Sequence, residues 1–298
     1  MILIAGCATW GGTTPCLLMA EISPVPGAKA APPRPDWLPL LQHLAGEVPN
    51  GTVWKNVEAG LNGSGDVDYA APTTDWATIE SAFLKWAGTQ GLGPVVACRH
   101  VPDALFLIAL DRSKGAFAQL DVRGRATFRG SRIFHPEDLR TLSQRDERGF
   151  RRLRPGAEGL IKLVLNGVAA GGRPKPRGLG KEGVGALLGG DPDGARLAAR
   201  LFGLARPAAA AGAAAAASGV WNRRAMVLVE LRALALTPLN PDIVWKRLAA
   251  RRVKRTCPVL VAGIDHGRCI PGDLDAWVAE VALDHAVHHP LANKAERE

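Results

Sequence analysis

The pattern that most constrains the fold of this chain is a pair of aspartates, Asp66 and Asp68, set one residue apart at the start of an apolar segment. Side chains alternate between the two faces of a β-strand. This spacing therefore predicts that both carboxylates project to one side of a sheet while Val67 turns into the core. Neighbouring carboxylates repel each other unless a cation lies between them, and Mg²⁺ prefers oxygen ligands. The segment predicts a strand that carries a metal site.

A third acid, Asp121, lies in the strand-like run FAQLDV over residues 117–122. It needs a partner or a metal ion, because an unpaired charge in a buried strand is costly. Residues 111–115 (DRSKG) have the composition of a hairpin connection and follow a β-like run over residues 104–110. We therefore expect Asp121 on a strand that neighbours the first one, with three carboxylates in reach of one or two Mg²⁺ ions.

Together these segments resemble the nucleotidyltransferase superfamily of the DNA polymerase β type. The resemblance is carried by residues 65–69 (GDVDY), residues 120–122 (LDV) and the helix-like residues 76–91 between them. Residues 53–56 (VWKN) and 155–160 (PGAEGL) look like a bacterial subgroup found near polysaccharide biosynthesis. The resemblance covers about residues 36–167. It implies an α/β (α+β) fold in which helices flank a mixed, nucleotidyltransferase-like sheet.

The resemblance also implies an activity. This is Mg²⁺- or Mn²⁺-dependent transfer of a nucleoside monophosphate from an NTP, such as ATP, to a hydroxyl or phosphate acceptor. In two-metal phosphoryl transfer one ion activates the attacking hydroxyl and the other neutralises the leaving group. By resemblance, Asp66 and Asp68 bind both ions, whereas Asp121 holds the ion at the nucleophile and accepts its proton. The acceptor would be an anionic small molecule, sugar, protein or RNA end.

The residues expected to hold the donor's phosphates depart from the superfamily's pattern. A Gly-Gly or Gly-Ser pair usually stands at a helix start well before the first aspartate. Here Lys55 occupies that spacing, and Ser64 lies almost directly against Asp66. Lys55 is expected to hold a phosphate as a point charge, with Ser64 as a second candidate. Arg123, Arg125 and Arg129 all fall on odd positions of an edge strand expected over residues 122–129. On such a strand arginines either grip phosphates or guard the edge against pairing.

The charge of the chain indicates an anionic partner without identifying it. The net charge is +9, and Lys and Arg concentrate in residues 121–180 and 221–260, after the acidic segment. Such blocks raise the local concentration of nucleotides, sugar phosphates or nucleic acid, although an arginine-rich solvated face is an equally simple explanation. A second interpretation therefore stays open: a catalytically inactive nucleotidyltransferase-like module that binds nucleic acid or another anionic partner.

Four regions are predicted along the chain. They are an N-terminal extension with a Pro-rich tether (1–35), the nucleotidyltransferase-like domain (36–170), a Gly/Pro- and Ala-rich linker region (171–220) and a mostly helical C-terminal domain (221–298). Helices are expected over residues 37–47, 76–91, 136–144, 155–165, 222–236 and 240–254. Glu158 and Lys162 are expected to pair on a helix surface. Glu58 is expected to be a surface acid rather than a fourth ligand.

Other sequence features narrow the class of protein. Five cysteines at wide spacings, with no C-x-x-C pair, indicate reduced thiols and argue against a zinc site. The apolar start of the chain lacks the positive charge of a signal peptide. The alanine-rich stretch does not reach the roughly 20 strongly apolar residues of a membrane span. We therefore expect a cytoplasmic protein without a membrane span.

Overall fold

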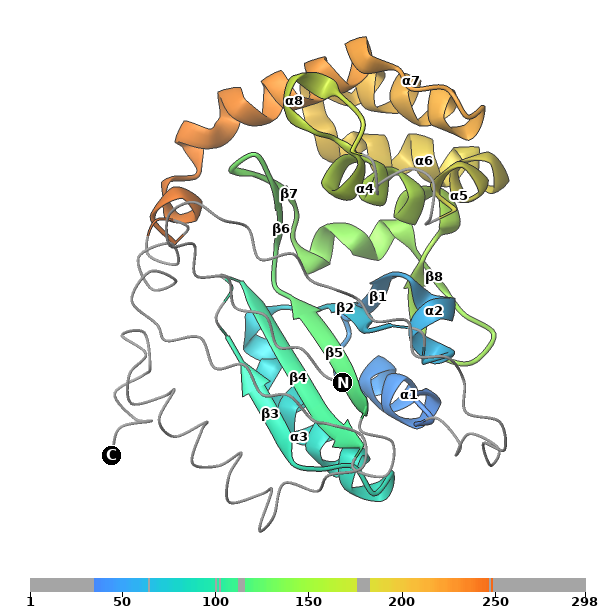
Figure 1. The fold of residues 1–298 in the computed structure, drawn as a ribbon, viewed down its shortest axis with the longest axis vertical. Coiled ribbons are helices and arrows are strands. Elements are labelled where there is room, and N and C mark those ends of the chain that lie inside the picture. Colours follow the sequence, from blue (N-terminus) through green and yellow to red (C-terminus); the bar gives the residue numbers. More distant parts are fainter. Residues whose placement is uncertain are drawn as a thin grey trace, which may run out of the picture.

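The computed structural model describes residues 35–63, 65–99, 101, 103–111, 116–175, 183–246 and 248. Within these ranges the chain is a mixed α/β protein in which helices flank a multi-stranded sheet (Figure 1). This confirms the predicted fold class at the level of its layers. The predictions made for residues 1–34, for Ser64 and for residues 249–298 lie outside the described ranges.

The main sheet has seven strands in the order β3-β4-β5-β2-β1-β9-β8. They are β1 (Thr52–Lys55), β2 (Val67–Ala70), β3 (Val95–Cys98), β4 (Ala104–Asp111), β5 (Ala116–Arg123), β8 (Ser143–Arg145) and β9 (Arg151–Leu153). β2 runs parallel to β5 and antiparallel to β1, β1 runs parallel to β9, and the remaining neighbours are antiparallel. The sheet is therefore mixed, and β2 and β5 lie side by side in its interior.

Two helices cover one face of this sheet, α1 (Leu38–Glu47) and α3 (Trp76–Thr89), the latter preceded by the short η1 (Thr73–Asp75). Their apolar stripes pack with alternate residues of the central strands in one continuous core. At its edge the rings of Trp37 and Trp86 stack with their centroids 4.4 Å apart. The helices predicted over residues 37–47 and 76–91 are thus confirmed, and they fix which strand residues face inward.

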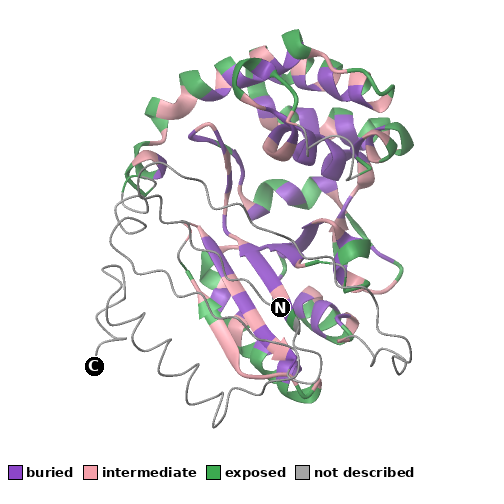
Figure 2. Cartoon of the chain, in the orientation of Figure 1, coloured by how far each residue is buried: buried purple, intermediate pink, exposed green. Residues whose placement is uncertain are grey.

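A second group of helices stands at the other end of the molecule, in yellow-green to orange in Figure 1. It comprises α4 (Pro155–Gly167), η3 (Ala170–Gly172), α5 (Val184–Gly190), α6 (Pro192–Ala198), η4 (Ala199–Ala205), α7 (Arg206–Ala217), α8 (Arg223–Leu236) and η5 (Thr237–Leu239). Their buried residues form one cluster with Trp54 and Ala70 of the sheet. Figure 2 shows the buried side of each helix turned toward the others. The helices predicted over residues 155–165 and 222–236 are confirmed.

The described part of residues 171–220 is not the predicted linker. Residues 184–217 are helical, and Ala209 and Ala213 of α7 are buried in the shared core. Small side chains let helix backbones approach closely. By composition alone, a segment rich in such residues looks like a low-complexity segment. At Gly156 on α4, for example, an added Cβ would lie 1.8 Å from the carbonyl oxygen of Asp191. The alanines and glycines are therefore packing residues.

The run over residues 122–129 is not one edge strand. β5 ends at Arg123 and lies between β4 and β2, so it is an interior strand. The chain then enters a separate two-stranded sheet, β6 (Ala126–Phe128) and β7 (Ser131–Phe134). The helix predicted over residues 136–144 is the 3₁₀ helix η2 (Pro136–Leu142), which ends where β8 begins. The alternating arginines of the sequence therefore do not form one stripe.

The described residues also include one cysteine and all of the helices named above. Among the described residues, no helix is long and apolar enough to cross a bilayer. Cys98 is free, and burial raises the pKa of its thiol. The other four cysteines of the sequence lie outside the described ranges.

Candidate metal centre

β2 and β5 bring the acids together because the two strands are parallel neighbours. In their register Asp68 lies opposite Asp121, and Val67 lies opposite Leu120. The two apolar residues are buried in the core under α1 and α3. Since neighbouring side chains alternate, the two carboxylates lie on the other face of the sheet. Asp66 immediately precedes β2 and is two residues from Asp68, so its side chain projects from the same face of the sheet as that of Asp68.

Three carboxylates converge on this face. One oxygen from each of Asp66, Asp68 and Asp121 lies within 4.8 Å of the other two. Asp68 and Asp121 are buried, with 1% and 6% of their surface exposed, whereas Asp66 is partly exposed. The predicted convergence of the three side chains is therefore confirmed. Oxygen donors gathered in this way suit a hard divalent cation, and the exposure of Asp66 leaves the group open to solvent.

Asp68 is the member whose polar atoms are least satisfied. Its buried Oδ2 has no hydrogen-bond partner among the described residues. Its Oδ1 forms an ion pair with Lys55, whose Nζ lies 2.9 Å away. Burial raises the pKa of Asp68 to about 7; Lys55 opposes the rise, and the charges of Asp66 and Asp121 add to it. A buried carboxylate left in this condition fits a ligand for a cation.

Asp121 has a different environment. Burial raises its pKa to about 6; Gln119 opposes the rise and the neighbouring Asp66 adds to it. Gln119 Nε2 donates a hydrogen bond of 2.6 Å to Asp121 Oδ1. Both residues lie on β5, two apart, so they share a face of the sheet. A carboxylate with this pKa is mostly ionised at neutral pH and is still basic enough to accept a proton.

An irregularity in β1 aims Lys55 at the carboxylates. Val53 lies opposite Tyr69, but the residue opposite Asp68 is Lys55, not Trp54. One extra residue on a strand is a β-bulge, which redirects the side chains that follow it. With regular pairing Lys55 would share the face of Val53, which is buried toward α1 and α3. The bulge instead places Lys55 on the carboxylate face.

The turn after Lys55, between β1 and α2 (Val57–Leu61), is tied to α4 by a buried charged pair. Asn56 donates its backbone N–H to Glu158 Oε1 at 2.9 Å, and Lys162 Nζ donates to Asn56 Oδ1 at 2.8 Å. Lys162 Nζ lies 3.6 Å from Glu158 Oε1. Each of these two residues has only 3% of its surface exposed. The predicted pairing of Glu158 with Lys162 is therefore confirmed, but its predicted place on a helix surface is wrong.

The sequence did contain a signal for this buried pair. Ile161 and Leu163 flank Lys162, and α4 buries almost every residue from Gly156 to Val164. A helix that is apolar on all sides is a buried helix, so a charged residue within it needs an internal partner. The i, i+4 spacing of Glu158 and Lys162 predicts an ion pair, and the apolar residues around them indicate that this pair is buried.

The arginines predicted to hold phosphates differ in their surroundings. Arg123 shares the face of Asp121 by alternation and lies 5.1 Å from the ring centroid of Phe106; its charge acts to lower the pKa of Asp121. Arg125 instead donates to Asp103 and to Asp242, at 3.0 and 2.8 Å. Its guanidinium is thus engaged by carboxylates outside the cluster.

Glu58 lies apart from the three aspartates. Its side chain is 57% exposed and pairs with Arg148 and Arg152, at 2.8 and 2.9 Å. The described cluster of possible metal ligands does not include it. The expectation of a surface acid is therefore confirmed.

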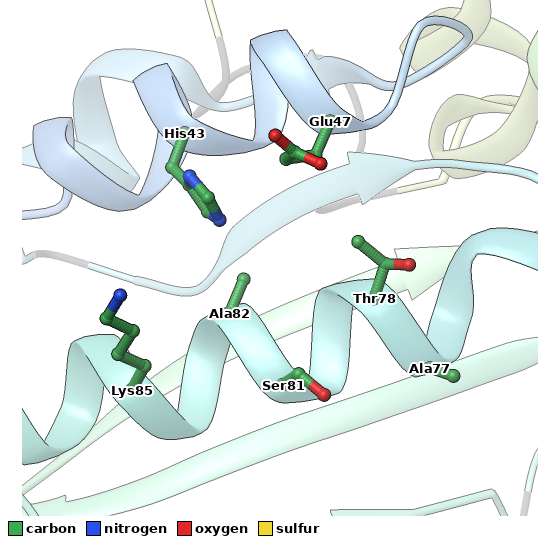
Figure 3. Close-up of a pocket in the computed structure, with 7 residues that line it drawn as sticks. All are labelled: His43, Glu47, Ala77, Thr78, Ser81, Ala82 and Lys85. Atoms are coloured by element: carbon green, nitrogen blue, oxygen red, sulfur yellow. The ribbon is translucent and has the colours of Figure 1, made fainter.

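A groove lies between α1 and α3. Figure 3 shows His43 and Glu47 of α1 facing Thr78 and Lys85 of α3 across it. Both helices cover the sheet face opposite the carboxylates. The groove is therefore separate from the candidate metal centre.

Comparison with known proteins adds no assignment. The chain matches no protein-family model, no curated protein and no solved structure. The chemistry of the site is therefore argued from its residues and geometry.

Proposed function

We propose that this chain is a Mg²⁺-dependent nucleotidyltransferase that moves a nucleoside monophosphate from an NTP to a hydroxyl or phosphate acceptor. One observation carries the proposal: Asp66, Asp68 and Asp121 converge within 4.8 Å on one face of two parallel strands. The buried Oδ2 of Asp68, which has no hydrogen-bond partner among the described residues, supports a divalent cation as a further partner of this carboxylate. The order of the acids along the chain supports the resemblance to the polymerase β-type superfamily.

The three carboxylates would divide the work of holding two ions. Asp66 and Asp68 would ligate both, and Asp121 would ligate the ion on the acceptor side. The bound Mg²⁺ would supply activation of the attacking hydroxyl and neutralisation of charge on the leaving pyrophosphate. Asp121, with a pKa near 6, suits the acceptance of the hydroxyl proton. Gln119 would keep the Asp121 carboxylate oriented through its hydrogen bond.

Lys55 and Arg123 are the cations proposed to meet the donor's phosphates. Both lie on the carboxylate face, Lys55 by way of the bulge in β1 and Arg123 by alternation with Asp121. Their charges would offset those of the triphosphate without adding ligands to the metal. Ser64 stays a candidate from the sequence alone.

A non-catalytic, anion-binding module is the second candidate function. It is favoured by one observation: the backbone N–H of Asn56 is already used by Glu158, so no amide cradle for phosphates is free at that position. The two candidates differ in one outcome. An enzyme consumes its nucleotide and needs all three acids, whereas a binding module holds an anion without chemistry and tolerates their loss.

The direct test is transfer of label from each α-³²P-NTP to fractions of a cell lysate, with Mg²⁺ or Mn²⁺ present. We expect the wild type to transfer the label to an acceptor and to release unlabelled pyrophosphate, and we expect Asp121→Asn to lose about 10²-fold or more of this activity. Glu230→Gln is the matched control, since Glu230 is a buried carboxylate on α8 that pairs with Arg129. Equal labelling by Asp121→Asn and the wild type would refute the enzyme. Retained anion binding with no turnover would favour the module.

A further inference from the structure

The turn between β1 and α2 contains two unfavourable backbone features, two residues apart. Trp54 forms the bulge in β1, and Asn56 adopts a left-handed backbone conformation with φ 55° and ψ 31°. A residue other than glycine held in that region costs about 1 kcal/mol or more, although asparagine tolerates it best. Such strain persists only where surrounding contacts enforce it. Lys55 lies between these two residues.

The contacts that enforce the turn come from α4. Glu158 accepts the backbone N–H of Asn56, and Lys162 donates to its side-chain oxygen. Arg152 adds a second cation 3.8 Å from Glu158. A buried ion pair seldom stabilises a fold more than apolar residues of the same volume would, because desolvation offsets the attraction. The pair is therefore better explained by what it fixes than by the stability it adds.

We propose that Glu158 and Lys162 are positioning residues that lock the Asn56 turn and so hold Lys55 against Asp68. Lys55 then occupies the place of a cation in the metal-free protein. It is displaced from Asp68 when a divalent ion binds, and it becomes the ligand for the phosphates of a nucleoside triphosphate. In this arrangement a side chain replaces the missing backbone cradle, since the Asn56 amide is committed to Glu158. This inference rests on the function proposed above.

The arrangement predicts effects of opposite sign on two ligands. Lys55 competes with a divalent ion for Asp68, so a loosened Lys55 should let Mn²⁺ alone bind more tightly. The same change should weaken binding of the anionic nucleotide, because its cationic ligand is no longer held in place. A purely structural role for the pair would weaken both or change neither.

The test uses the full chain with Glu158→Gln/Lys162→Met, which removes both charges together and leaves neither one unpaired. Asn56→Gly is the second variant, because glycine accepts the left-handed backbone and removes the oxygen that Lys162 bonds. Each is titrated with Mn²⁺ alone, then with a non-hydrolysable NTP analogue in the presence of Mn²⁺. The labelling rate of Lys55 by an amine reagent, followed by mass spectrometry, reports its position without any need for activity. Glu230→Gln is again the control.

We expect both variants to bind Mn²⁺ about threefold more tightly or better, to bind the analogue about threefold more weakly or worse, and to label faster at Lys55. Lys55→Met should reproduce the two affinity changes. The positioning role is overturned if the folded variants bind both ligands more weakly than the wild type, or if the labelling of Lys55 and both affinities equal those of the wild type. If the wild type binds no Mn²⁺, the proposed function fails; faster labelling in the variants would then still report the lock.

Discussion

The sharpest consequence of a metal site built from buried carboxylates is that removing one of them should stabilise the metal-free protein. Asp68→Asn keeps the shape of the side chain and removes its charge. Burial raises the pKa of Asp68 from 3.8 to about 7. The folded protein therefore holds this proton more tightly than the unfolded chain does. The stability that comes from protonated Asp68 is present at low pH and is lost as the pH rises from about 4 to about 7.

The size of the effect follows from that difference. A rise from 3.8 to about 7 corresponds to about 4 kcal/mol of unfolding free energy lost at pH 8, as an upper bound. The amide cannot recover all of it, since Lys55 loses its partner. We expect Asp68→Asn to raise the unfolding free energy by about 1–3 kcal/mol at pH 8 in EDTA. At pH 5 we expect little difference, because wild-type Asp68 is protonated there.

The assay is urea denaturation of both proteins at pH 8 and pH 5, in EDTA and in excess Mg²⁺. At 100 times its dissociation constant the ion should stabilise the wild type by about 2.7 kcal/mol, and Asp68→Asn should gain little. The difference in unfolding free energy between Asp68→Asn and the wild type at pH 8 should therefore become smaller, or change sign, when Mg²⁺ is added. A variant less stable than the wild type in EDTA at pH 8, with equal gains from Mg²⁺, would refute the reasoning. Asp68 would then be a structural partner of Lys55.

Three further predictions follow from the same structure. Mn²⁺ affinity, measured by calorimetry, should fall as the pH drops below about 7 and again below about 6, because protons compete for Asp68 and then Asp121; a constant affinity from pH 8 to 5.5 would contradict this. Lys55→Met should lower kcat/KM for the NTP about tenfold or more and should destabilise the metal-free protein at pH 8, because the buried Asp68 loses its partner; unchanged kcat/KM would remove Lys55 from the site. Gly156→Ala should cost about 2 kcal/mol or more, because its Cβ would meet the Asp191 carbonyl, whereas Gly46→Ala, in an open helix position, should be neutral or slightly stabilising by thermal denaturation.

Local patterns in the sequence were enough to predict the central sheet and its acids. Period-two alternation around Asp66, Asp68 and Asp121 defines both strands and the face that each acid takes. Helical spacing of apolar residues predicts α1, α3, α4 and α8 with small errors at their ends. These signals are readable because each depends only on residues within one strand or helix.

Features that depend on a distant partner were missed. The burial of Glu158 and Lys162 results from packing of α4 against the turn at Asn56, about a hundred residues earlier in the chain. The bulge that aims Lys55 exists only in the pairing of two strands, and no composition signal marks it. The alanine-rich region, which includes α7, was predicted to be a linker because alanine side chains bury little apolar area. In the structure these alanines pack closely in the shared core. The spacing of Arg123, Arg125 and Arg129 predicts one stripe on a single strand. In the structure β5 ends at Arg123, and after Gly124 the chain enters β6 of a separate sheet.

The account depends most on Asp121, which comes from a different strand than the other two acids and joins them only through the parallel pairing of β2 with β5. The most direct measurement is electron paramagnetic resonance of Mn²⁺ titrated at pH 8 into the wild type, Asp121→Asn and the control Glu230→Gln. The account predicts bound Mn²⁺ in the wild type and the control, and a loss of about tenfold or more in affinity for Asp121→Asn. Undiminished Mn²⁺ binding by Asp121→Asn, or none by the wild type, would contradict a metal centre shared by these three carboxylates.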